Sequence, residues 1–570
     1  MTVKTLTGAQ ALVKCLENEG VEYIWGLPGG AALPMYDALV GSKIKLIQVR
    51  HEQGATHMAD GYARATGKPG VVLVTSGPGA TNTLTGIMTA HMDSVPMVVL
   101  TGQTVSYMLG KDAFQEADVF DISMPIVKHS YLIRRTEEIP RILREAFHIT
   151  NSGRPGPVLI DIPKNFSSAG FSGNLSPDMD LPGYRPDGRH IDHEAITAVA
   201  EALNKSQRPV LLVGHGALIS GAHDNVRLLA EKLRAPVITT LLGKGAFPDS
   251  HPYNLGMLGM HGTAYANKAL VDCDLVMSIG CRFDDRIIGR SDAFCRNAVR
   301  IHIDIDPSEF GRMVACNLYC AGDARLVIEE LLKHVGELKT EAWMERLETY
   351  KKRFPLTYKK RGGLKMQHVL SVLDDMLAGE GIVATDVGQH QMWAAQFIHT
   401  EKPGSWLSSG GAGTMGYGFP AAIGAQLGRP NEAVWAIVGD GGFQMTMCEL
   451  ATAAINKLPV KVIVMNNHYL GMVRQWQSMF YEDRKSGVDL EGSPDFARLA
   501  GCYNGALGLT LRRAADTRKI LERAMAHNEG PCVINAVVEK TDNVFPMIPA
   551  GASLEEMLVR EPKQKDKVES

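Results

Sequence analysis

The sequence has no long hydrophobic run and no excess of basic residues. None of its apolar runs approaches the ~18 residues needed to span a bilayer. Its 59 Lys and Arg residues against 62 Asp and Glu leave a formal net charge of −3. This balance gives no basic surface field for a nucleic acid backbone or an anionic membrane. We therefore expect no nucleic acid and no membrane among the partners of the chain.

Cysteine is also sparse, with nine residues in 570 and no CxxC pair. The closest pair, Cys316 and Cys320, has no second pair to complete a zinc site. We interpret the cysteines as reduced core thiols in a reducing compartment. The start of the chain lacks the apolar stretch of a signal peptide and carries Glu17 and Glu19, which predicts a cytoplasmic protein. An organellar form without its transit peptide fits the same observations.

Short apolar runs are abundant, and helical stretches separate them. Runs this uniformly apolar are typical of strands buried on both faces, and their alternation with helices indicates doubly wound parallel sheets of the α/β class. A length of 570 residues allows three to four domains at roughly 150 residues each. The runs are KLIQV, GVVLVTS, PMVVLTG, PVLIDIP, PVLLVG, PVITT, LVMSIG, IHIDID, AVWAIVGD, KVIVMNN and CVINAVV.

Two breaks divide the chain into three α/β units. Residues 171–192 are rich in Pro, Gly and Asp, and the charged stretch 336–366 contains a Gly pair near its end. These breaks indicate linkers between compact units. We therefore predict domains at residues 1–180, 192–340 and 366–550, followed by a C-terminal tail at 551–570 whose last residues, 559–570, are solvated.

The first and third units share an order of features that suggests an internal repeat. In each, an apolar strand leads to a Gly-rich turn, a helix, a proline and a second strand with a polar end. Duplicated α/β units commonly bind a ligand between them, at the carboxyl ends of the strands. Because α/β units resemble one another in any case, the pattern alone leaves a chance likeness open.

Asp440 and Asn467 each follow a predicted strand, with one helix between them. A right-handed crossover brings both strand ends to the same edge of the sheet. Asp, Asn and main-chain oxygens suit Mg²⁺, which takes further ligands from phosphates. Gly439, Gly441 and Gly442 let the backbone approach a phosphate, and no Walker motif is present. The pattern indicates a metal-held diphosphate site, whereas a lone Asp in a glycine turn is usually a cap or turn former.

The GDGG and NN motifs of this site resemble the thiamine diphosphate motif, and the whole chain resembles the large catalytic subunits of the acetohydroxyacid synthase (acetolactate synthase) family. The resemblance implies two thiamine diphosphate-binding domains flanking a central FAD-binding domain. It also implies Tyr469 as a metal ligand beside Asp440 and Asn467. The motifs that carry it, nearly end to end, are GLPGGAALPMYDAL, RHEQGATHMADGYARATGKPGV, TSGPGATN, KDAFQEAD, RPGPVLIDIPKN, GMLGMHGTAYAN, RFDDR, TDVGQHQMWAAQ, GGAGTMGYGFPAAIGA, GMVRQWQSMFYE and NVFPMIPAGAS.

The resemblance implies that Glu52 shares a proton with the aminopyrimidine ring of the cofactor, a general acid–base role. Phe114, Gln115 and Lys164 resemble residues that border the active site and the substrate channel. An isolated Glu, Gln or Lys is otherwise usually a solvated residue. Met415 matches the large apolar residue that props the cofactor into a bent shape, with core packing as the alternative.

The family's remaining cofactor contacts fall into three groups. The pyrimidine-side residues are Leu27, Pro28, Pro78 and Asn82. The diphosphate-side residues are Val387, Gln389, Gly413, Met415, Gly439, Asp440, Gly441, Gly442 and Asn467. The flavin-side residues are Gly216, Thr240, Leu241, Met257, Gly280, Arg282, Asp284, Arg286, Asp304 and Asp323. The turn at 214–221 is a weak Rossmann fingerprint, and because the net reaction moves no electrons, we expect the flavin to be structural or vestigial.

Two residues are expected to decide the substrate class. Arg282 can receive the carboxylate of a 2-oxo acid through a bidentate fork. Trp476 can wall the acceptor pocket and favour an ethyl over a methyl group. The alternatives are a salt bridge of Arg282 with Asp284 or Asp285 and a core position for Trp476. The other residues expected in this pocket are Phe114, Met257, Met260 and Met472.

The predicted reaction decarboxylates pyruvate on thiamine diphosphate and transfers the two-carbon unit to a second pyruvate or to 2-oxobutyrate, for valine, leucine and isoleucine biosynthesis. Another thiamine diphosphate-dependent 2-oxo acid carboligase, decarboxylase or oxidase is the alternative. A non-catalytic or flavin-redox protein on the same scaffold is a third hypothesis. Glu52 argues against glyoxylate carboligase, and RFDDR with RQWQ argues against the flavin-free catabolic acetolactate synthases.

The resemblance also implies an active site formed between two chains, hence a homodimer or homotetramer, and a small regulatory subunit. Val105 departs from the family, which commonly has Pro at this place, at the channel mouth where herbicidal inhibitors bind. We expect weaker inhibition by sulfonylurea-type compounds with the chemistry intact. Ala412, where relatives often have Leu, is a second departure and carries no prediction.

Overall fold

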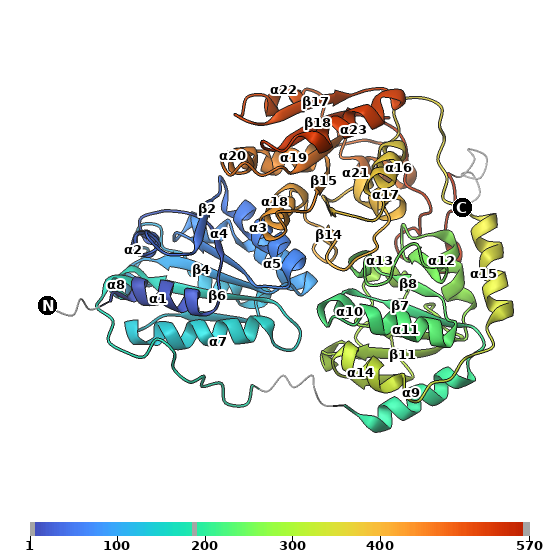
Figure 1. Cartoon of the computed structure of the whole chain (residues 1–570), viewed down its shortest axis with the longest axis horizontal. Helices are drawn as coiled ribbons and strands as arrows, with labels where there is room; N and C mark the ends of the chain where they lie inside the picture. Colours follow the sequence, from blue (N-terminus) through green and yellow to red (C-terminus); the bar gives the residue numbers. More distant parts are fainter. Residues whose placement is uncertain (1–5, 185–190, 562–570) are drawn as a thin grey trace.

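The computed structural model describes residues 6–184 and 191–561 and contains three six-stranded parallel sheets. Residues 1–5 of the predicted first domain, 185–190 of the predicted linker and 562–570 of the predicted tail lie outside the described residues. Figure 1 places the N-terminal domain at the left, the central domain at the lower right and the C-terminal domain at the top. The predicted α/β class with three parallel sheets is therefore confirmed.

The N-terminal sheet has the strand order β2-β1-β3-β4-β6-β5. Strands β3, β4 and β6 are buried along their whole length, as their continuous apolar runs predict. The strands are β1 Tyr23–Leu27, β2 Lys45–Gln48, β3 Gly70–Val74, β4 Met97–Gln103, β5 His129–Leu132 and β6 Pro157–Pro163. The helices include α1 Gly8–Asn18, α2 Leu33–Ala38, α3 Glu52–Thr66, α4 Pro78–Thr81, α5 Leu84–Asp93, α6 Val119–Ser123, α7 Ile139–Asn151 and α8 Lys164–Ser168.

The C-terminal sheet repeats that order as β14-β13-β15-β16-β18-β17. The internal repeat suggested by the sequence is thus present as two sheets of identical topology. The strands are β13 Ile382–Thr385, β14 Trp406–Ser408, β15 Val434–Gly439, β16 Lys461–Asn466, β17 Leu507–Leu511 and β18 Cys532–Val537. The helices include α16 Met366–Leu377, α17 Gln389–Phe397, α18 Gly418–Gly428, α19 Asp440–Thr446, α20 Leu450–Ile455, α21 Gly471–Phe480, α22 Phe496–Ala500 and α23 Thr517–Ala526.

The central sheet has a different order, β12-β11-β10-β7-β8-β9, in which the connections reverse direction between β10 and β7. This is the doubly wound order whose switch point commonly holds a nucleotide. The strands are β7 Pro209–Val213, β8 Val237–Thr239, β9 Asn254–Met257, β10 Leu275–Ile279, β11 Val299–Asp304 and β12 Leu318–Ala321. The helices include α9 His193–Lys205, α10 His215–Ile219, α11 His223–Leu233, α12 Ala264–Asp272, α13 Asp285–Ile288, α14 Ala324–Leu331 and α15 Glu341–Arg353.

The N-terminal and C-terminal sheets share one apolar core, which contains buried side chains from both. Helices α3 and α18 cross at its centre and lie side by side in Figure 1. Gly61 of α3 permits this approach, because a Cβ at this position would lie 2.0 Å from the carbonyl oxygen of Ala421. Gly424 of α18 meets the backbone of Met58 in the same way. The two domains are therefore packed backbone to backbone within one chain.

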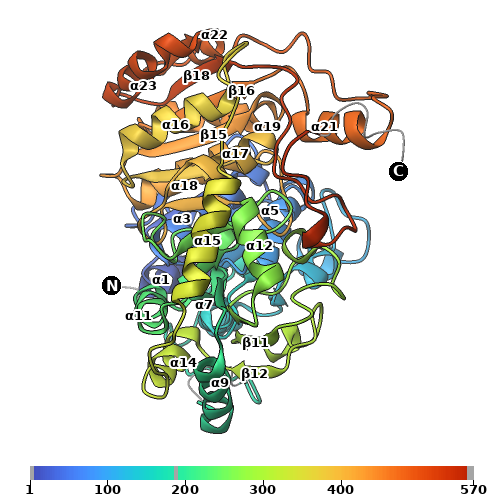
Figure 2. The same ribbon diagram turned by 90° about the vertical axis from the view of Figure 1, so that its right-hand side faces the viewer.

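The segment after β18 packs against the central domain. Figure 2 shows this chain running from the C-terminal sheet toward the central domain, where Ile548 and Leu554 join the apolar core around α12 and α15. The backbone N–H of Ile548 donates to the carbonyl of Met260 at 2.9 Å. Residues 551–558, the first part of the predicted C-terminal tail, therefore contribute apolar side chains to the core of the central domain.

The cysteines are all free, but they are not all core thiols. Cys448 and Cys502 are exposed, which corrects the prediction for these two residues. Among residues 6–184 and 191–561, no group of three His, Cys, Asp or Glu side chains is arranged to hold a metal ion by itself. Within the same ranges, no helix combines the length and apolarity needed to cross a membrane.

Candidate active site

A cavity of about 860 Å³ lies where the three domains meet. The C-terminal domain contributes strand ends and the segment after β14, and the central domain contributes the carboxyl ends of β7, β10 and β11. The N-terminal domain contributes only the end of α5, with Asp93, and the turn around Arg154. This position, at the carboxyl edges of two parallel sheets, is typical of ligand sites in α/β proteins.

Asp440, Asn467 and Tyr469 all line one wall of this cavity. Strands β15 and β16 are paired in register, with Gly439 opposite Met465, so the residues that follow them emerge at one edge. The Asp440 side chain is buried, and its Oδ2 atom has no hydrogen-bond partner. Burial raises the pKa of Asp440 to about 7. A buried carboxylate with a free oxygen, beside an amide oxygen, fits a bound divalent cation.

The same wall contains His390, which the sequence analysis missed. Its imidazole is buried, lines the cavity and leaves Nε2 without a partner, and burial lowers its pKa to about 3. A neutral imidazole at the start of α17, next to Gln389, fits a phosphate oxygen or a water. The signal in the sequence was its position beside Gln389 in the GQHQ motif.

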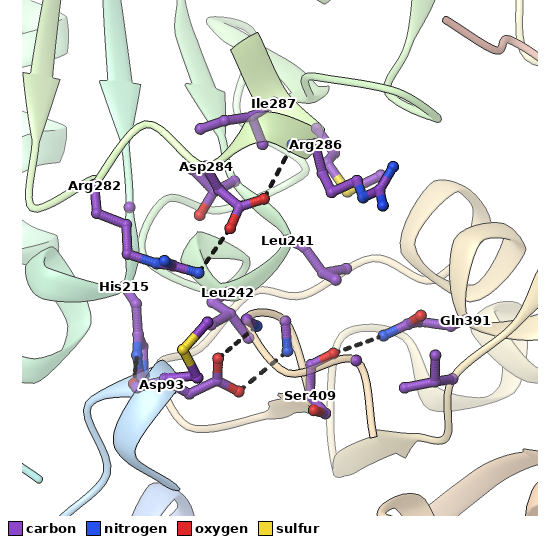
Figure 3. Close-up of a pocket in the computed structure, with 18 of the residues that line it drawn as sticks. Asp93, His215, Leu241, Leu242, Arg282, Asp284, Arg286, Ile287, Gln391 and Ser409 are labelled. Atoms are coloured by element: carbon purple, nitrogen blue, oxygen red, sulfur yellow. Dashed lines mark hydrogen bonds and ion pairs between the residues drawn. The ribbon is translucent and has the colours of Figure 1, made fainter. Parts of the chain in front are cut away.

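The segment between β14 and α18 forms the floor of the cavity and carries Gly413 and Met415. Two buried carboxylates hold it. Asp93 accepts hydrogen bonds from the N–H groups of Gly410 and Gly411, at 3.1 and 2.7 Å (Figure 3). Asp386 accepts from the N–H groups of Gly416 and Gly418, each at 3.0 Å, and burial raises its pKa to about 6. The segment is therefore fixed at both ends.

Arg282 and Arg286 of the central domain and Trp476 of α21 also line the cavity. Arg282 pairs with Asp284 at 2.7 Å, as Figure 3 shows, and its guanidinium still reaches the cavity. The salt bridge and the cavity position thus coexist. The Arg286 guanidinium carbon lies 5.6 Å from the centre of the Trp476 ring, a cation–π contact that orients the indole. The alternative of a core position for Trp476 is wrong, because the side chain is only partly buried.

The predicted flavin-side residues also line this cavity. They lie along the carboxyl edge of the central sheet, on both sides of the switch point between β7 and β10. Arg154, which the sequence analysis missed, reaches this wall from the N-terminal domain and pairs with Glu309 at 2.7 Å. The other predicted flavin-side residues at the cavity are Gly216, Thr240, Leu241, Met257, Gly280, Asp304 and Asp323.

The structure does not bring the predicted N-terminal residues into this cavity. Glu52 begins α3 with its side chain buried, and Oε2 accepts a hydrogen bond from Asn82 Nδ2 at 3.0 Å. Gln115 packs against Gly77, with its backbone at a φ of 55°. These residues form a second cluster at the carboxyl edge of the N-terminal sheet. The predicted residues outside the cavity are Leu27, Pro28, Glu52, Pro78, Asn82, Phe114, Gln115 and Lys164.

Phe114 is the most exposed member of this second cluster, with 89% of its surface accessible. It lies in the segment between β4 and α6, which Gln103 ties down by donating from Nε2 to the carbonyl of Ala117 at 2.7 Å. A large aromatic side chain this exposed is unusual on a surface that stays in contact with water. The carboxyl edge of the N-terminal sheet therefore has the features of a site that a second surface completes.

Three family models match the chain. They are described as thiamine pyrophosphate enzyme N-terminal TPP binding domain, central domain and C-terminal TPP binding domain, and they cover residues 6–122, 196–331 and 386–536. Each match falls on one of the three sheets described above. The order along the chain is the order of the three domains in the structure.

Curated relatives cover nearly the whole chain. An acetolactate synthase from Mycobacterium bovis is 47% identical, covering 98% of this chain and 92% of the relative. An acetolactate synthase large subunit from Corynebacterium glutamicum is 46% identical over 96% of this chain and 89% of the relative. An acetolactate synthase from Arthrospira platensis is 45% identical over 98% of both chains. The chain therefore belongs to the acetolactate synthase family of thiamine pyrophosphate enzymes.

Proposed function

We propose that this chain catalyses acetolactate synthesis: it decarboxylates pyruvate and joins the two-carbon unit to a second pyruvate or to 2-oxobutyrate. Family membership supports the reaction. The single structural observation that carries the proposal is the buried carboxylate of Asp440, with one unpartnered oxygen, at the edge of the three-domain cavity. A site of this kind suits a metal-held diphosphate, which anchors thiamine pyrophosphate.

Asp440, Asn467 and Tyr469 would hold Mg²⁺, and the glycines at 439, 441 and 442 would admit the diphosphate. The fit rests on the orphaned Asp440 oxygen and on the oxygen-rich donor set. Met415 would support the cofactor from the segment that Asp93 and Asp386 hold. When bound, thiamine pyrophosphate supplies an electron sink for decarboxylation, and the protein supplies geometry and electrostatics.

Glu52 would hold a proton at its carboxyl group and exchange it with the aminopyrimidine ring. The hydrogen bond from Asn82 leaves Oε1 as the atom available for this proton. Arg282 would bind the carboxylate of a 2-oxo acid by charge-assisted hydrogen bonds. Trp476, oriented by Arg286, would set the size of the acceptor pocket.

FAD would lie along the central-domain wall of the same cavity. The fit rests on the switch-point edge of a doubly wound sheet and on the continuity of the cavity from Asp304 and Asp323 to Arg282. The expected reaction transfers no net electrons, so the flavin would support the structure of the site. Few residues of the N-terminal domain line the cavity, which agrees with FAD being held by the central and C-terminal domains.

The separation of Glu52 from the Asp440 cavity supports an active site built from two chains. In this arrangement, the N-terminal edge of one chain completes the cavity of its partner, in a homodimer or a homotetramer. The exposed Phe114 would be covered by that contact. One relative is named a large subunit, and we propose that this chain likewise works with a small regulatory subunit.

The proposal is tested by assaying the purified protein with pyruvate alone and with both 2-oxo acids, with thiamine pyrophosphate, Mg²⁺ and FAD omitted in turn. We expect a yellow protein that forms 2-acetolactate and 2-aceto-2-hydroxybutyrate, needs Mg²⁺ and thiamine pyrophosphate, and leaves its flavin oxidised. Acetaldehyde as the main product, or flavin reduction in each turnover, would contradict the proposal in favour of a decarboxylase or an oxidase.

A further inference from the structure

Two segments of the predicted active site are held by carboxylates from the opposite domain of the same chain. The first segment follows β14 and leads to Met415. Asp93, at the end of α5 in the N-terminal domain, accepts from the N–H groups of Gly410 and Gly411 (Figure 3). Arg64 neutralises this buried carboxylate at 2.8 Å. A Cβ on Gly411 would lie 3.0 Å from Asp93 Oδ1 and 2.9 Å from Arg282 Nη2, so the contact leaves no room for a side chain.

The second segment follows β2 and leads to Glu52. Glu449, between η6 Met447–Glu449 and α20 in the C-terminal domain, is fully buried. Its carboxylate accepts from the N–H groups of Arg50 and His51 at 3.1 and 2.9 Å. Thr452 donates to the other oxygen at 2.6 Å. The turn that enters α3 is thus set by a residue of the C-terminal domain.

The two contacts are counterparts. Strands β2 and β14 occupy the same outer place in the two identical strand orders. In each case a carboxylate from the sister domain binds two successive N–H groups just beyond that strand. The reciprocity is not required by either fold alone, because each carboxylate could have been supplied by its own domain, as Asp386 is for Gly416 and Gly418.

We propose that Asp93 and Glu449 are reciprocal positioning residues: Asp93 sets the Met415 segment of its own chain, and Glu449 sets the Glu52 turn of its own chain. The inference deepens the proposed function and rests on it for the roles of Met415 and Glu52. Asp93 thus serves the part of the site that the C-terminal domain forms, although it lies in the N-terminal domain. Glu449 serves the part that the N-terminal domain forms, although it lies in the C-terminal domain. Neither residue touches the reacting atoms.

Substitution by the amide has a defined physical effect at both places. At Asp93 each oxygen accepts from one of the two glycine N–H groups, whereas Glu449 Oε1 accepts from both N–H groups and Oε2 accepts from Thr452 and, at 3.2 Å, from the Arg50 N–H. In either orientation an amide turns its NH₂ group toward at least one of these N–H donors, which weakens the contact. In Asp93→Asn we expect the affinity for thiamine pyrophosphate to fall about 10-fold, because the Met415 segment shifts. In Glu449→Gln we expect kcat to fall about 10-fold with the affinity retained, because Glu52 shifts.

The first test measures thiamine pyrophosphate binding to apoprotein by calorimetry, together with kcat and the melting temperature. Asp249→Asn is the control for Asp93→Asn, since the Asp249 carboxylate is buried, pairs with Lys244 of its own domain at 2.6 Å and accepts from the N–H of Thr400 in the C-terminal domain at 2.9 Å. Glu145→Gln is the control for Glu449→Gln, since Glu145 is buried and paired with Arg141. Equal losses of affinity and kcat in variants and controls with matched melting temperatures would overturn the inference.

The second test uses dimers of two differently tagged chains, isolated by two affinity steps. A dimer of Glu52→Gln with Asp440→Asn recovers about half of wild-type activity if the site joins two chains. We then expect the same recovery for Glu52→Gln with Asp93→Asn, for Asp440→Asn with Glu449→Gln, and for Asp93→Asn with Glu449→Gln. We expect no more than the mean of the two parent homodimers for Asp93→Asn with Asp440→Asn and for Glu449→Gln with Glu52→Gln. All dimers are assayed at Mg²⁺ and thiamine pyrophosphate concentrations that saturate wild type but leave the Asp93→Asn and Asp440→Asn homodimers largely unsaturated.

The outcomes distinguish the two-chain active site from the positioning roles of Asp93 and Glu449. If Glu52→Gln with Asp440→Asn gives no recovery, the two-chain site is wrong, and the affinity and kcat measurements alone decide the positioning roles. If that pair recovers but Asp93→Asn complements Asp440→Asn instead of Glu52→Gln, the positioning role of Asp93 is wrong. The same reversal for Glu449→Gln overturns its role.

Discussion

The N-terminal and C-terminal domains have the same strand order but different chemistry at the carboxyl edges of their sheets. After β15 the C-terminal domain places the acidic Asp440, at the start of α19, whereas after the equivalent β3 the N-terminal domain places a glycine–proline turn at the start of α4. After the equivalent edge strands, one domain carries Glu52 and the other a glycine-rich floor. The shared fold places the carboxyl ends of the strands at one edge of each sheet. A few residues at that edge determine whether it exchanges a proton or binds a metal-bound anion.

The same contrast appears inside the two sheets. Between β4 and β6, the Asp161 carboxylate accepts from Thr101 at 2.6 Å and from Gln103 at 2.9 Å. Between the equivalent β16 and β18, the buried pair is neutral, with Asn466 donating to Asn535 at 3.1 Å. The N-terminal sheet thus carries an ionisable group where its sister carries amides.

Glu52→Gln should give the largest effect, because it removes the proton-exchanging group of the N-terminal edge. We expect kcat to fall by about 100-fold or more, with thiamine pyrophosphate affinity close to wild type. Steady-state kinetics and cofactor titration measure both quantities. Glu137→Gln, an exposed glutamate of the same domain, is the control. Unchanged exchange of the C2 proton of the bound cofactor in Glu52→Gln would exclude the proposed role.

Asp440→Asn removes the charge of the opposite edge and should act on binding instead. We expect the Mg²⁺ concentration for half activation to rise by at least about 10-fold, and the cofactor to bind more weakly, because the amide is a poorer ligand. A Mg²⁺ titration of activity measures the shift. If Asp440→Asn lowered only kcat, as expected for Glu52→Gln, the assignment of metal binding to the C-terminal edge and proton exchange to the N-terminal edge would be wrong.

Trp476→Leu should change the choice of acceptor. We expect the preference for 2-oxobutyrate over pyruvate to fall about 10-fold, since the discrimination rests on one methylene group in a shaped pocket. Product ratios in mixtures of both acids measure it. Gln477→Ala, on the same helix and away from the cavity lining, should keep the wild-type ratio. An unchanged ratio in Trp476→Leu would remove this residue from the acceptor pocket.

Asp161→Asn makes the N-terminal polar pair resemble the neutral pair of the C-terminal sheet. Burial raises the pKa of Asp161 from 3.8 to about 7, so the native state holds a proton that the unfolded chain releases. The stability linked to this proton is present below pH ~4 and is lost as pH rises through ~7. Relative to wild type, the variant should therefore gain stability between about pH 4 and about pH 7, with little further change at higher pH. Melting temperatures across this range measure it, and a constant difference would contradict the raised pKa.

Val105→Pro should give the smallest catalytic effect. Val105 follows β4 and precedes the short helix η1 Ser106–Met108, with an extended φ of −65° that proline adopts readily. We expect unchanged kcat and several-fold stronger inhibition by sulfonylurea-type compounds. Inhibition curves for both proteins measure it. Equal inhibition of wild type and Val105→Pro would refute the expected role of this position.

The sequence predicted the parts of the fold and site that have local signals. The interior strands other than β1 and β13 were predicted because their apolar runs are continuous. Strand β13 has only four residues, β1 is only partly buried at both ends, and the edge strand β5 is half exposed, so none of the three formed a clear run. Asp440 and Asn467 were predicted from spacing after strands. Asp93 and Glu449 were not, because each binds backbone N–H groups more than 300 positions away in the sequence. Backbone donors carry no residue signature, so only the fold reveals such partners.

The reciprocal contacts have a consequence for how the chain matures during synthesis. His51 and Glu449 are separated by 398 positions, and Gly411 and Asp93 by 318. The N-terminal sheet can close once its last strand has left the ribosome, but the turn before Glu52 acquires its carboxylate only after the C-terminal domain has emerged. Long-range contacts of this kind form late in folding. In a nascent or truncated chain, the N-terminal sheet would therefore be folded while the turn before Glu52 still lacked its contact with Glu449. Activity would begin only when the chain is nearly complete.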